Sequence, residues 1–370
     1  MIVLSAFGQP SQDAVVHDMC GKTVAMLGES PVHGFGGTLE FKAGLVRRLI
    51  DECHYNAFFI ESGTYDFLNI QKRLKSGQEV TEPMVAAAIG GLWATHEVEP
   101  LIPFLLAKAK AGSVTLGGLD DQLGRGTYAQ RGMPADLVEH LQGEEKAGCL
   151  AILQRHMLWQ YTNDAPYGPE DKSRILGCLD QVSGSEYDLA MAGNLERLLA
   201  RDFRPGIEKG ANTRVLDGND RDRSMYQNFQ WLWSRLPVHS KVIVWSATTH
   251  IAKDLSGVSG EEGVVQFGSY IHKEFKDGAF ALGFSALTGS YAMANQPAKQ
   301  LSAAPGDSLE AMNFADGTGD TVYLSWKDLE KAGPIQARPL GTSLKTAKWN
   351  DVLDGLVILR EERVPDFIRR

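Results

Sequence analysis

Long apolar runs and clusters of basic residues are both missing from this sequence of 370 residues. No apolar run reaches the length of a membrane-spanning helix, and the opening MIVLSAFGQPSQD lacks the basic stretch of a signal peptide. The net charge is −9 and no run of Lys and Arg occurs, which argues against binding to nucleic acid or to an anionic membrane. We therefore expect a soluble, cytoplasmic protein.

Common catalytic and metal-binding motifs are also absent. The chain has no G-x-S-x-G nucleophile elbow, no G-x-x-x-x-G-K-[ST] phosphate loop and no H-E-x-x-H zinc motif. Its cysteines lie far apart without C-x-x-C spacing, which indicates reduced thiols in a cytosolic protein; they are Cys20, Cys53, Cys149 and Cys178. We expect no bound metal and no cofactor.

The hydrophobic pattern is typical of an α/β fold. Short apolar runs rich in β-branched or aromatic residues alternate with longer segments of helical spacing. This alternation predicts a central, largely parallel sheet flanked by helices. The predicted strands are residues 23–27, 57–60, 113–116, 241–245, 264–267, 279–284, 321–324 and 355–359.

The stretch from about residue 124 to residue 230 shows three- and four-residue apolar spacing and no strand pattern. We interpret it as a helical insert over one edge of the sheet. The chain then divides into an α/β catalytic core, residues 1–123 and 231–370, and the insert, residues 124–230. Residues 291–319 are rich in Ala, Gly, Pro, Ser and Asp, and we expect them to form a long surface connection.

Polar residues follow four of the predicted strands. In open α/β sheets ligands bind at the carboxyl ends of the strands, so these side chains are expected to meet in one region. They are Glu29 and His33 after the first strand, Glu61 after the second, Asp120 and Gln122 after the third, and His250 after the fourth.

Each of these residues also has a structural explanation. His33 lies in a Gly-rich loop, where an exposed or structural histidine is common. Glu29 and Glu61 can be rim residues at strand ends, His250 can simply begin the next helix, and Asp120 can belong to a turn. Only their convergence favours a site.

Several segments, taken in order, resemble the erythromycin esterase family. Residues 28–34 are similar to its G-E-x-x-H-G loop, residues 40–42 to the E-x-[RK] of its next helix, and Glu61 to the acidic end of its second strand. Trp93 and Glu97 look like the helix that follows. Later matches are residues 118–122 (G-F-D-x-Q), 221–228 (R-D-x-x-M-x-x-N) and 241–250 (W-A-H-N-x-H), so the resemblance spans about residues 20–360.

The resemblance implies an α/β sheet with a helical lid over a cleft in which macrolide lactones or other esters are hydrolysed. The loop histidine of the family, here His33, is the expected general base that takes a proton from water. Glu29 or Glu61 would orient it, and Lys42 would steady an oxyanion or pair with one of these acids. The remaining expected site residues are His250, on the catalytic side, and Asp120, Gln122 and Arg221 for substrate binding.

Departures from the family pattern leave the reaction open. The loop G-E-S-P-V-H-G is one residue longer than usual, and Lys42 stands where Arg is more common. Ala247 occupies the position of the first His in W-A-H-N-x-H; either this site does altered chemistry, or another residue such as His272 supplies the missing donor.

Three functions are therefore compatible with the sequence. The first is an ester or lactone hydrolase with His33 as base. The second is a diverged family member that performs acyl transfer, cyclisation or dehydration in natural-product biosynthesis. The third is a binding protein or a metal-dependent hydrolase, because His and carboxylate side chains can ligate metals. In each case the expected partner is a small molecule, and the chain is expected to be a monomer or a homodimer.

Overall fold

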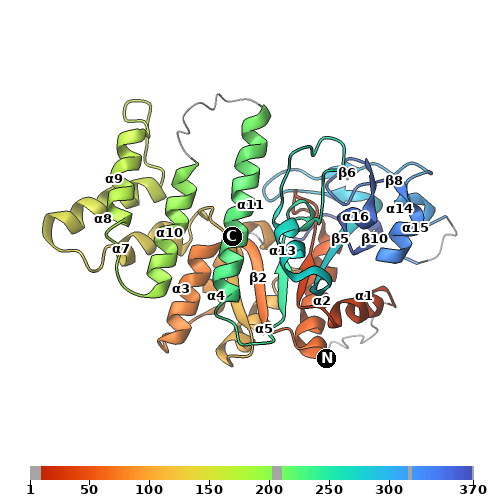
Figure 1. Ribbon diagram of the computed structural model, residues 1–370, viewed down its shortest axis with the longest axis horizontal. Helices are drawn as coiled ribbons and strands as arrows, with labels where there is room; N and C mark the ends of the chain where they lie inside the picture. The colour runs from red at the N-terminus through yellow and green to blue at the C-terminus, as the bar shows by residue number, and fades with distance from the viewer. Residues whose placement is uncertain (1–9, 202–210, 316–318, 369–370) are drawn as a thin grey trace. The chain divides into compact units, whose positions relative to one another are not determined.

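The computed structural model describes residues 10–201, 211–315 and 319–368, and the chain divides into two compact units (Figure 1). The first unit contains Met1–Phe59, Gly91–Val114 and Leu236–Arg370, and the second contains Ile60–Gly90 and Thr115–Arg235. The predicted insert, residues 124–230, falls within the second unit, which also includes residues 60–90 and 115–123.

A mostly parallel sheet forms the centre of the first unit. Its strand order is β2-β4-β1-β5-β10-β7, where only the first three residues of β2 belong to this unit. β1 runs parallel to β4 and β5, β10 runs parallel to β5, and β7 pairs antiparallel with β10. The strands are β1 (Val24–Leu27), β2 (Ala57–Gly63), β4 (Val242–Trp245), β5 (Ala279–Tyr291), β7 (Thr321–Ser325) and β10 (Gly355–Glu362). The predicted α/β class with a largely parallel sheet is confirmed.

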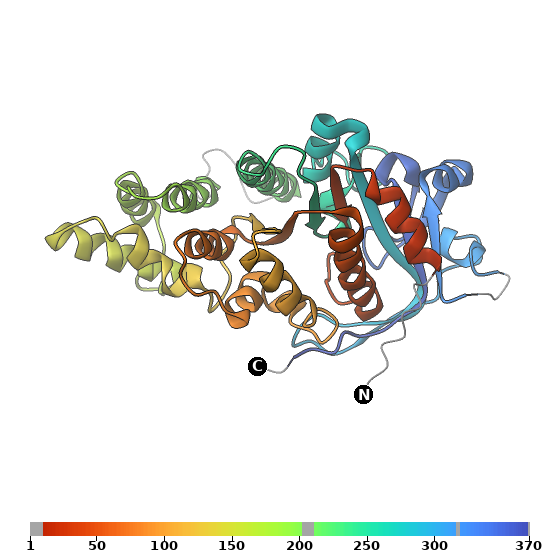
Figure 2. The same ribbon diagram turned by 90° about the horizontal axis from the view of Figure 1, so that it is seen from below.

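Helices cover both faces of this sheet, which is why every residue of β1 and β4 is buried. Figure 2 shows α2 (Gly36–Cys53) and α13 (Phe267–Phe275) on opposite sides of the strands. Phe41 of α2 packs edge-to-face on Phe284 of β5, with 5.5 Å between the ring centroids. Further helices of the first unit are α1 (Pro10–Cys20), α5 (Leu101–Lys110) and α12 (Thr248–Ile251), with the 3₁₀ turns η1 (Gly91–Trp93) and η2 (Lys276–Gly278).

Two expectations about the second half of the chain are wrong. Residues 264–266 form no strand, and the apolar run ends in the first turn of α13, where Phe267 is fully buried. A short apolar run cannot by itself distinguish a strand from a buried helix start. Residues 291–319 are not merely a surface connection, because Glu310 is fully buried and its carboxylate accepts a hydrogen bond from the Ser285 hydroxyl at 2.5 Å.

Small elements that the sequence did not predict complete the first unit. β6 (Lys299–Leu301) pairs antiparallel with β5, and β8 (Pro334–Ala337) pairs antiparallel with β9 (Lys345–Lys348). Three short helices accompany them: α14 (Leu309–Met312), α15 (Trp326–Ala332) and α16 (Trp349–Val352).

The second unit is mainly helical. The rest of β2 lies beside β3 (Thr115–Asp120); α3 and α11 pack against β3, and α10 packs against α3. Between residues 124 and 230 the described part of the chain contains helices and no strand, as predicted. The helices are α3 (Thr64–Lys75), α4 (Glu82–Ile89), α6 (Tyr128–Arg131), α7 (Met133–Leu137), α8 (Gly143–Met157), α9 (Pro169–Leu179), α10 (Glu186–Ala200) and α11 (Ala211–Trp233). Their shared core includes Leu153, Ile175, Met191 and Leu195, all fully buried.

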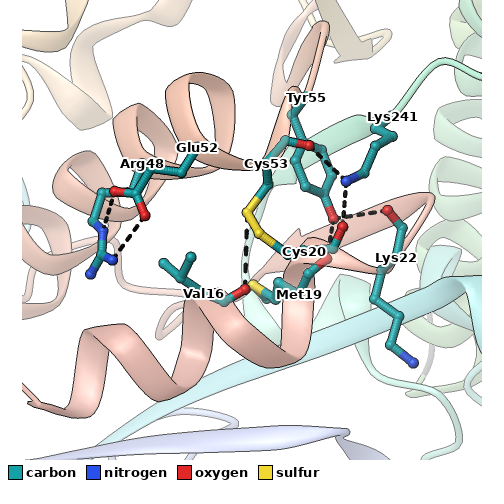
Figure 3. The surroundings of a disulfide bond; sticks show 9 residues. All are labelled: Val16, Met19, Cys20, Lys22, Arg48, Glu52, Cys53, Tyr55 and Lys241. Carbon is teal, nitrogen blue, oxygen red and sulfur yellow. Dashed lines mark hydrogen bonds and ion pairs between the residues drawn. A yellow bond between two sulfur atoms is a disulfide. The ribbon is translucent and has the colours of Figure 1, made fainter.

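The expectation of reduced thiols is wrong, because the four cysteines form two disulfides. Cys20 and Cys53 join the ends of α1 and α2, with 4.9 Å between their Cα atoms (Figure 3). Cys149 of α8 and Cys178 of α9 are joined in the second unit, with 5.5 Å between Cα atoms. Their separations of 33 and 29 residues match no local motif, so only the packing of the helices reveals the pairs.

Buried polar contacts surround the first disulfide. Figure 3 shows the Lys241 ammonium donating to the backbone carbonyls of Cys20 and Cys53, the latter at 2.7 Å. The Tyr55 hydroxyl donates to the carbonyl of Met19 at 2.7 Å. These bonds satisfy carbonyl groups at the ends of the two helices, which have no partner within the helix itself. Among the described residues, no helix is long and apolar enough to cross a membrane.

Candidate active site

Glu29 lies immediately after the buried strand β1, and its side chain is almost wholly inside the first unit, with 1% exposed. The residue before it, Gly28, has no room for a side chain. A Cβ at Gly28 would lie 2.5 Å from Thr248 Oγ1 and 2.9 Å from the carbonyl oxygen of Leu282. The backbone N–H of Thr248, at the start of α12, donates to the Glu29 carbonyl at 2.7 Å. The backbone on both sides of Glu29 is therefore closely held.

Four side chains converge on the Glu29 carboxylate. His33 Nδ1 lies 2.8 Å and Trp93 Nε1 2.7 Å from Oε1 of Glu29. Trp245 Nε1 lies 3.3 Å from the same oxygen. Lys42 Nζ lies 3.1 Å from Oε2. We call these five residues, all in the first unit, the Glu29 cluster.

The cluster keeps Glu29 ionised. Burial alone would raise the pKa of Glu29, but the Lys42 ammonium and the hydrogen bonds from His33 and Trp93 hold it below the usual value. A buried carboxylate is tolerated because it is both paired and hydrogen-bonded. Lys42 itself is fully buried, and its Nζ lies 4.1 Å from the centroid of the Trp245 ring, a cation–π contact.

His33 is held in a strained turn. Its backbone φ is +50°, a conformation that non-glycine residues seldom adopt, and its N–H donates to the carbonyl of Ser30 at 2.9 Å. The ring meets the edge of Trp93 at 5.1 Å between centroids, and the side chain is 10% exposed. When Nδ1 carries the proton and donates to Glu29, the lone pair of Nε2 is left to accept a proton.

A second polar cluster lies in the second unit and consists of Glu61, Asp120 and Arg221, the Arg221 cluster. Arg221 Nη2 lies 2.8 Å from Oε1 of Glu61 and 2.6 Å from Oδ2 of Asp120, while its Nε lies 3.2 Å from the same Asp120 oxygen. Glu61 and Asp120 are buried and lie within the strands, Glu61 two residues before the end of β2 and Asp120 as the last residue of β3, whereas the sequence predicted that both follow their strands. The two carboxylates raise the pKa of Arg221 despite its burial, so it stays a cation.

The remaining predicted site residues take different positions. The backbone N–H of Gln122 donates to Oδ1 of Asp120 at 3.2 Å, so residue 122 shapes the turn after β3. His250 lies in the four-residue helix α12 and is partly exposed. Ala247 caps the start of that helix and is 1% exposed.

His272 does not supply a donor for the Glu29 cluster. Its Nε2 lies 2.9 Å from Oδ2 of Asp354, and its Nδ1 lies 3.0 Å from the carbonyl oxygen of Gly268. Both ring nitrogens are therefore engaged. Asp354 lies just before β10, and its carboxylate also accepts the N–H of Ala281 at 2.8 Å, near the amino end of β5.

The two tryptophans of the Glu29 cluster were not predicted as site residues. Trp93 was noted only for the family resemblance, and Trp245 only as the end of a strand. A general rule could have suggested them, because a buried tryptophan N–H needs an acceptor and a buried carboxylate needs donors. Nothing in the one-dimensional pattern, however, places residues 93 and 245 beside Glu29.

Comparison with known proteins identifies the family of the chain. The family model for erythromycin esterase matches residues 50–352, and the chain belongs to this family. No curated protein matches the sequence. Among the described residues, no group of three or more His, Cys, Asp and Glu side chains is arranged to hold a metal ion.

Solved structures of similar fold share little sequence with the chain. A Bacillus cereus protein is 14% identical with a TM-score of 0.71, covering 96% of this chain and 92% of its own. A succinoglycan biosynthesis protein is 13% identical with a TM-score of 0.69, covering 98% and 100%. A mutant of the erythromycin esterase EreC in its open conformation is 17% identical with a TM-score of 0.64, covering 95% and 93%. At these identities the similarity shows the fold.

Proposed function

We propose that this protein hydrolyses an ester or lactone bond of a small molecule, with His33 as the general base. The observation that carries the proposal is the hydrogen bond between His33 and the buried, ionised Glu29. A base held by a carboxylate in this way has a fixed ring orientation and a fixed tautomer. Membership of the erythromycin esterase family supports ester hydrolysis as the reaction type.

The proposed reaction needs only water as co-reactant. Nε2 of His33 takes a proton from water while the water oxygen attacks the ester carbonyl carbon. The carbonyl oxygen becomes negative, and when the tetrahedral intermediate collapses the C–O bond to the alcohol breaks. The imidazolium returns its proton to the leaving alkoxide. Glu29 stabilises the imidazolium while it exists, because the carboxylate accepts its Nδ1–H at 2.8 Å.

Lys42 acts in this proposal through Glu29. Its ammonium is fully buried, 3.1 Å from Oε2 of Glu29 and stacked over Trp245. This geometry supports the second of its two expected roles, pairing with an acid, over contact with a substrate oxyanion. Lys42 therefore keeps the orienting carboxylate charged and is a positioning residue.

The Arg221 cluster is proposed to provide fixed polar groups for substrate binding. The Arg221 guanidinium lies within hydrogen-bond distance of both Glu61 and Asp120. We assign the role of orienting His33 to Glu29 and keep Asp120, Gln122 and Arg221 as the proposed binding residues. His250, which follows β4, stays a proposed residue on the catalytic side.

The expected cytoplasmic location is weakened by the two disulfides. Disulfides persist in oxidising compartments and are rare in the cytosol of most organisms. We propose an oxidising compartment as the site of maturation. Cofactor-free action on a small molecule, and a monomeric or homodimeric state, stay predictions.

A lactone and ester panel in ¹⁸O-labelled water tests the proposed function. Hydrolysis places one ¹⁸O atom in the product acid, whereas acyl transfer, cyclisation or dehydration does not. His33→Ala should lower kcat/KM by about 10²- to 10⁴-fold, the usual range for general-base assistance. His96→Ala is the matched control, because that histidine is 54% exposed and pairs with Glu99. Unlabelled product, or equal rates in both variants, would reject the proposal.

A further inference from the structure

A hollow of about 290 Å³ lies between α10 and α11 in the second unit. Its polar lining comes from one face of each helix. α10 and its C-terminal cap contribute Arg197 and Arg201, and α11 contributes Asp220, Arg223, Ser224 and Gln227. These positions recur every three or four residues, so the side chains of each helix face the same way.

Among the residues that the structure describes, the side chains that accept hydrogen bonds from Arg197 are all neutral. Its Nε donates to the hydroxyl of Ser224 at 3.1 Å, and its Nη2 donates to the amide oxygens of Asn194 and Asn228, both at 2.8 Å. Burial lowers the pKa of Arg197, although nearby Asp121 acts in the opposite direction. Its guanidinium is therefore partly desolvated, and no carboxylate of the described residues forms an ion pair with it.

The nearby carboxylate is already committed to Arg201. Asp121 is fully buried, and its two oxygens lie 2.6 Å and 2.8 Å from the terminal nitrogens of Arg201, a bidentate pair. Of the other lining groups, Asp220 and Arg223 carry opposite charges, so the lining keeps a net positive charge.

We propose that this hollow, the α10–α11 pocket, binds an oxyanion: a carboxylate or phosphate group of a small molecule. Arg197 and Arg201 supply the charge and the planar N–H donors that such anions prefer, and the exposed Gln227 supplies an amide donor at the rim. The proposal rests only on the second unit and is independent of ester hydrolysis by the Glu29 cluster.

Calorimetry with inorganic phosphate and with succinate, at constant ionic strength, tests the pocket in the full-length protein. Saturable binding of either anion is expected. Arg197→Met should weaken it at least tenfold, because a hydrogen bond to a charged group contributes about 1.5–3 kcal/mol. Arg235→Met is the matched control, since Arg235 lies outside the pocket and pairs with Glu186. The anion that binds more tightly shows whether the pocket prefers a phosphate or a carboxylate group.

A second variant protects the test against misfolding of Arg197→Met. Gln227→Glu changes an exposed side chain and places a negative charge in the pocket, so it should abolish anion binding while the melting temperature stays near that of the wild type. Absence of saturable binding in the wild-type protein would overturn the proposal. Equal binding by the wild type and both pocket variants would overturn it as well, since the anions would then bind elsewhere.

Discussion

The Glu29 cluster and the Arg221 cluster are built in opposite ways. In the first, one carboxylate is surrounded by donors: a histidine, a lysine and two tryptophans. In the second, one arginine is shared by two carboxylates. The first cluster contains an imidazole that can gain and lose a proton without breaking up the other contacts. The second consists of groups that hold one another in fixed charge states. The Glu29 cluster is therefore the candidate for proton transfer, and the Arg221 cluster is the candidate for positioning the substrate.

Replacing one carboxylate in each cluster should show this difference most strongly. Glu29→Gln is expected to lower kcat by about 10²- to 10⁴-fold, because an amide neither stabilises an imidazolium nor fixes the productive tautomer. Glu61→Gln should lower kcat much less. Steady-state kinetics on the best ester of the panel measures both.

The pH dependence of activity adds a control to the comparison of Glu29→Gln with Glu61→Gln. Because the pKa of Glu29 lies below its usual value, the wild type keeps this charge throughout pH 5–8. Glu29→Gln should therefore lose activity across the whole range and not only at one end. If Glu61→Gln proves the more damaging change, the assignment of the orienting acid must move to the second unit.

Removing the cation of each cluster compares their contributions to stability. Lys42→Met and Arg221→Met each leave buried carboxylates without their partner, which typically costs about 3–5 kcal/mol. The larger loss is expected for Lys42→Met, since Lys42 is fully buried whereas the Arg221 side chain is 23% exposed. Urea unfolding measures the change in the free energy of unfolding.

A double variant identifies the origin of that loss. Glu29→Gln combined with Lys42→Met removes both charges, so it should be more stable than Lys42→Met alone. Additive losses would mean that the two side chains do not interact in solution.

The disulfides allow the two units to be weakened separately. Cys20→Ala/Cys53→Ala acts on the first unit and Cys149→Ala/Cys178→Ala on the second. Each pair closes a loop of about 30 residues, and its removal should cost roughly 2–4 kcal/mol. Calorimetric melting with and without a reductant measures this loss of stability. In each double variant the reductant should lower the melting temperature less than in the wild type, because one disulfide is already missing. A wild-type melting curve that reductant leaves unchanged would show that the thiols are free.

Glu362 should have the smallest effect on stability, and it contrasts with Glu29. Both are buried carboxyl groups, but Glu362 accepts hydrogen bonds from the backbone N–H groups of Gly37 and Thr38 at the start of α2, and within the described part of the chain it forms no salt bridge with a Lys or Arg. Burial raises its pKa to about 7. The folded state then binds a proton more tightly than the unfolded state, so this contribution to stability is complete below pH 4.5 and is lost as the pH rises to about 7.

The corresponding measurement is the pH dependence of unfolding. Between pH 5 and pH 8 the wild type should lose up to about 3 kcal/mol more than Glu362→Gln, from about 1.4 kcal/mol for each unit of pKa shift. The opposite slope is expected from Glu29, whose pKa is lowered: its contribution is present above pH 4.5 and is lost as the pH falls through its folded-state pKa. Parallel curves for wild type and Glu362→Gln would show that Glu362 ionises normally.

The sequence alone determined the α/β class, most strands of the sheet and the helical character of residues 124–230. These features depend on local periodicity and on runs of apolar residues, which are properties of neighbouring positions. Glu29 and His33 could be proposed as a pair for the same reason, since both lie in one short loop after β1.

The tertiary structure decided which distant residues meet. Trp93 and Trp245 reach Glu29 from positions 64 and 216 residues away, and Lys42 rather than an arginine balances its charge. Cysteines 33 and 29 residues apart became disulfides, contrary to expectation. The apolar run around Val264 predicts a strand, but Val264 and Val265 lie before α13 with Val265 41% exposed, and only Phe267 at the end of the run is buried in the first turn of that helix. Contacts of this kind depend on how helices and strands pack, and packing is a property of the whole chain that no local pattern contains.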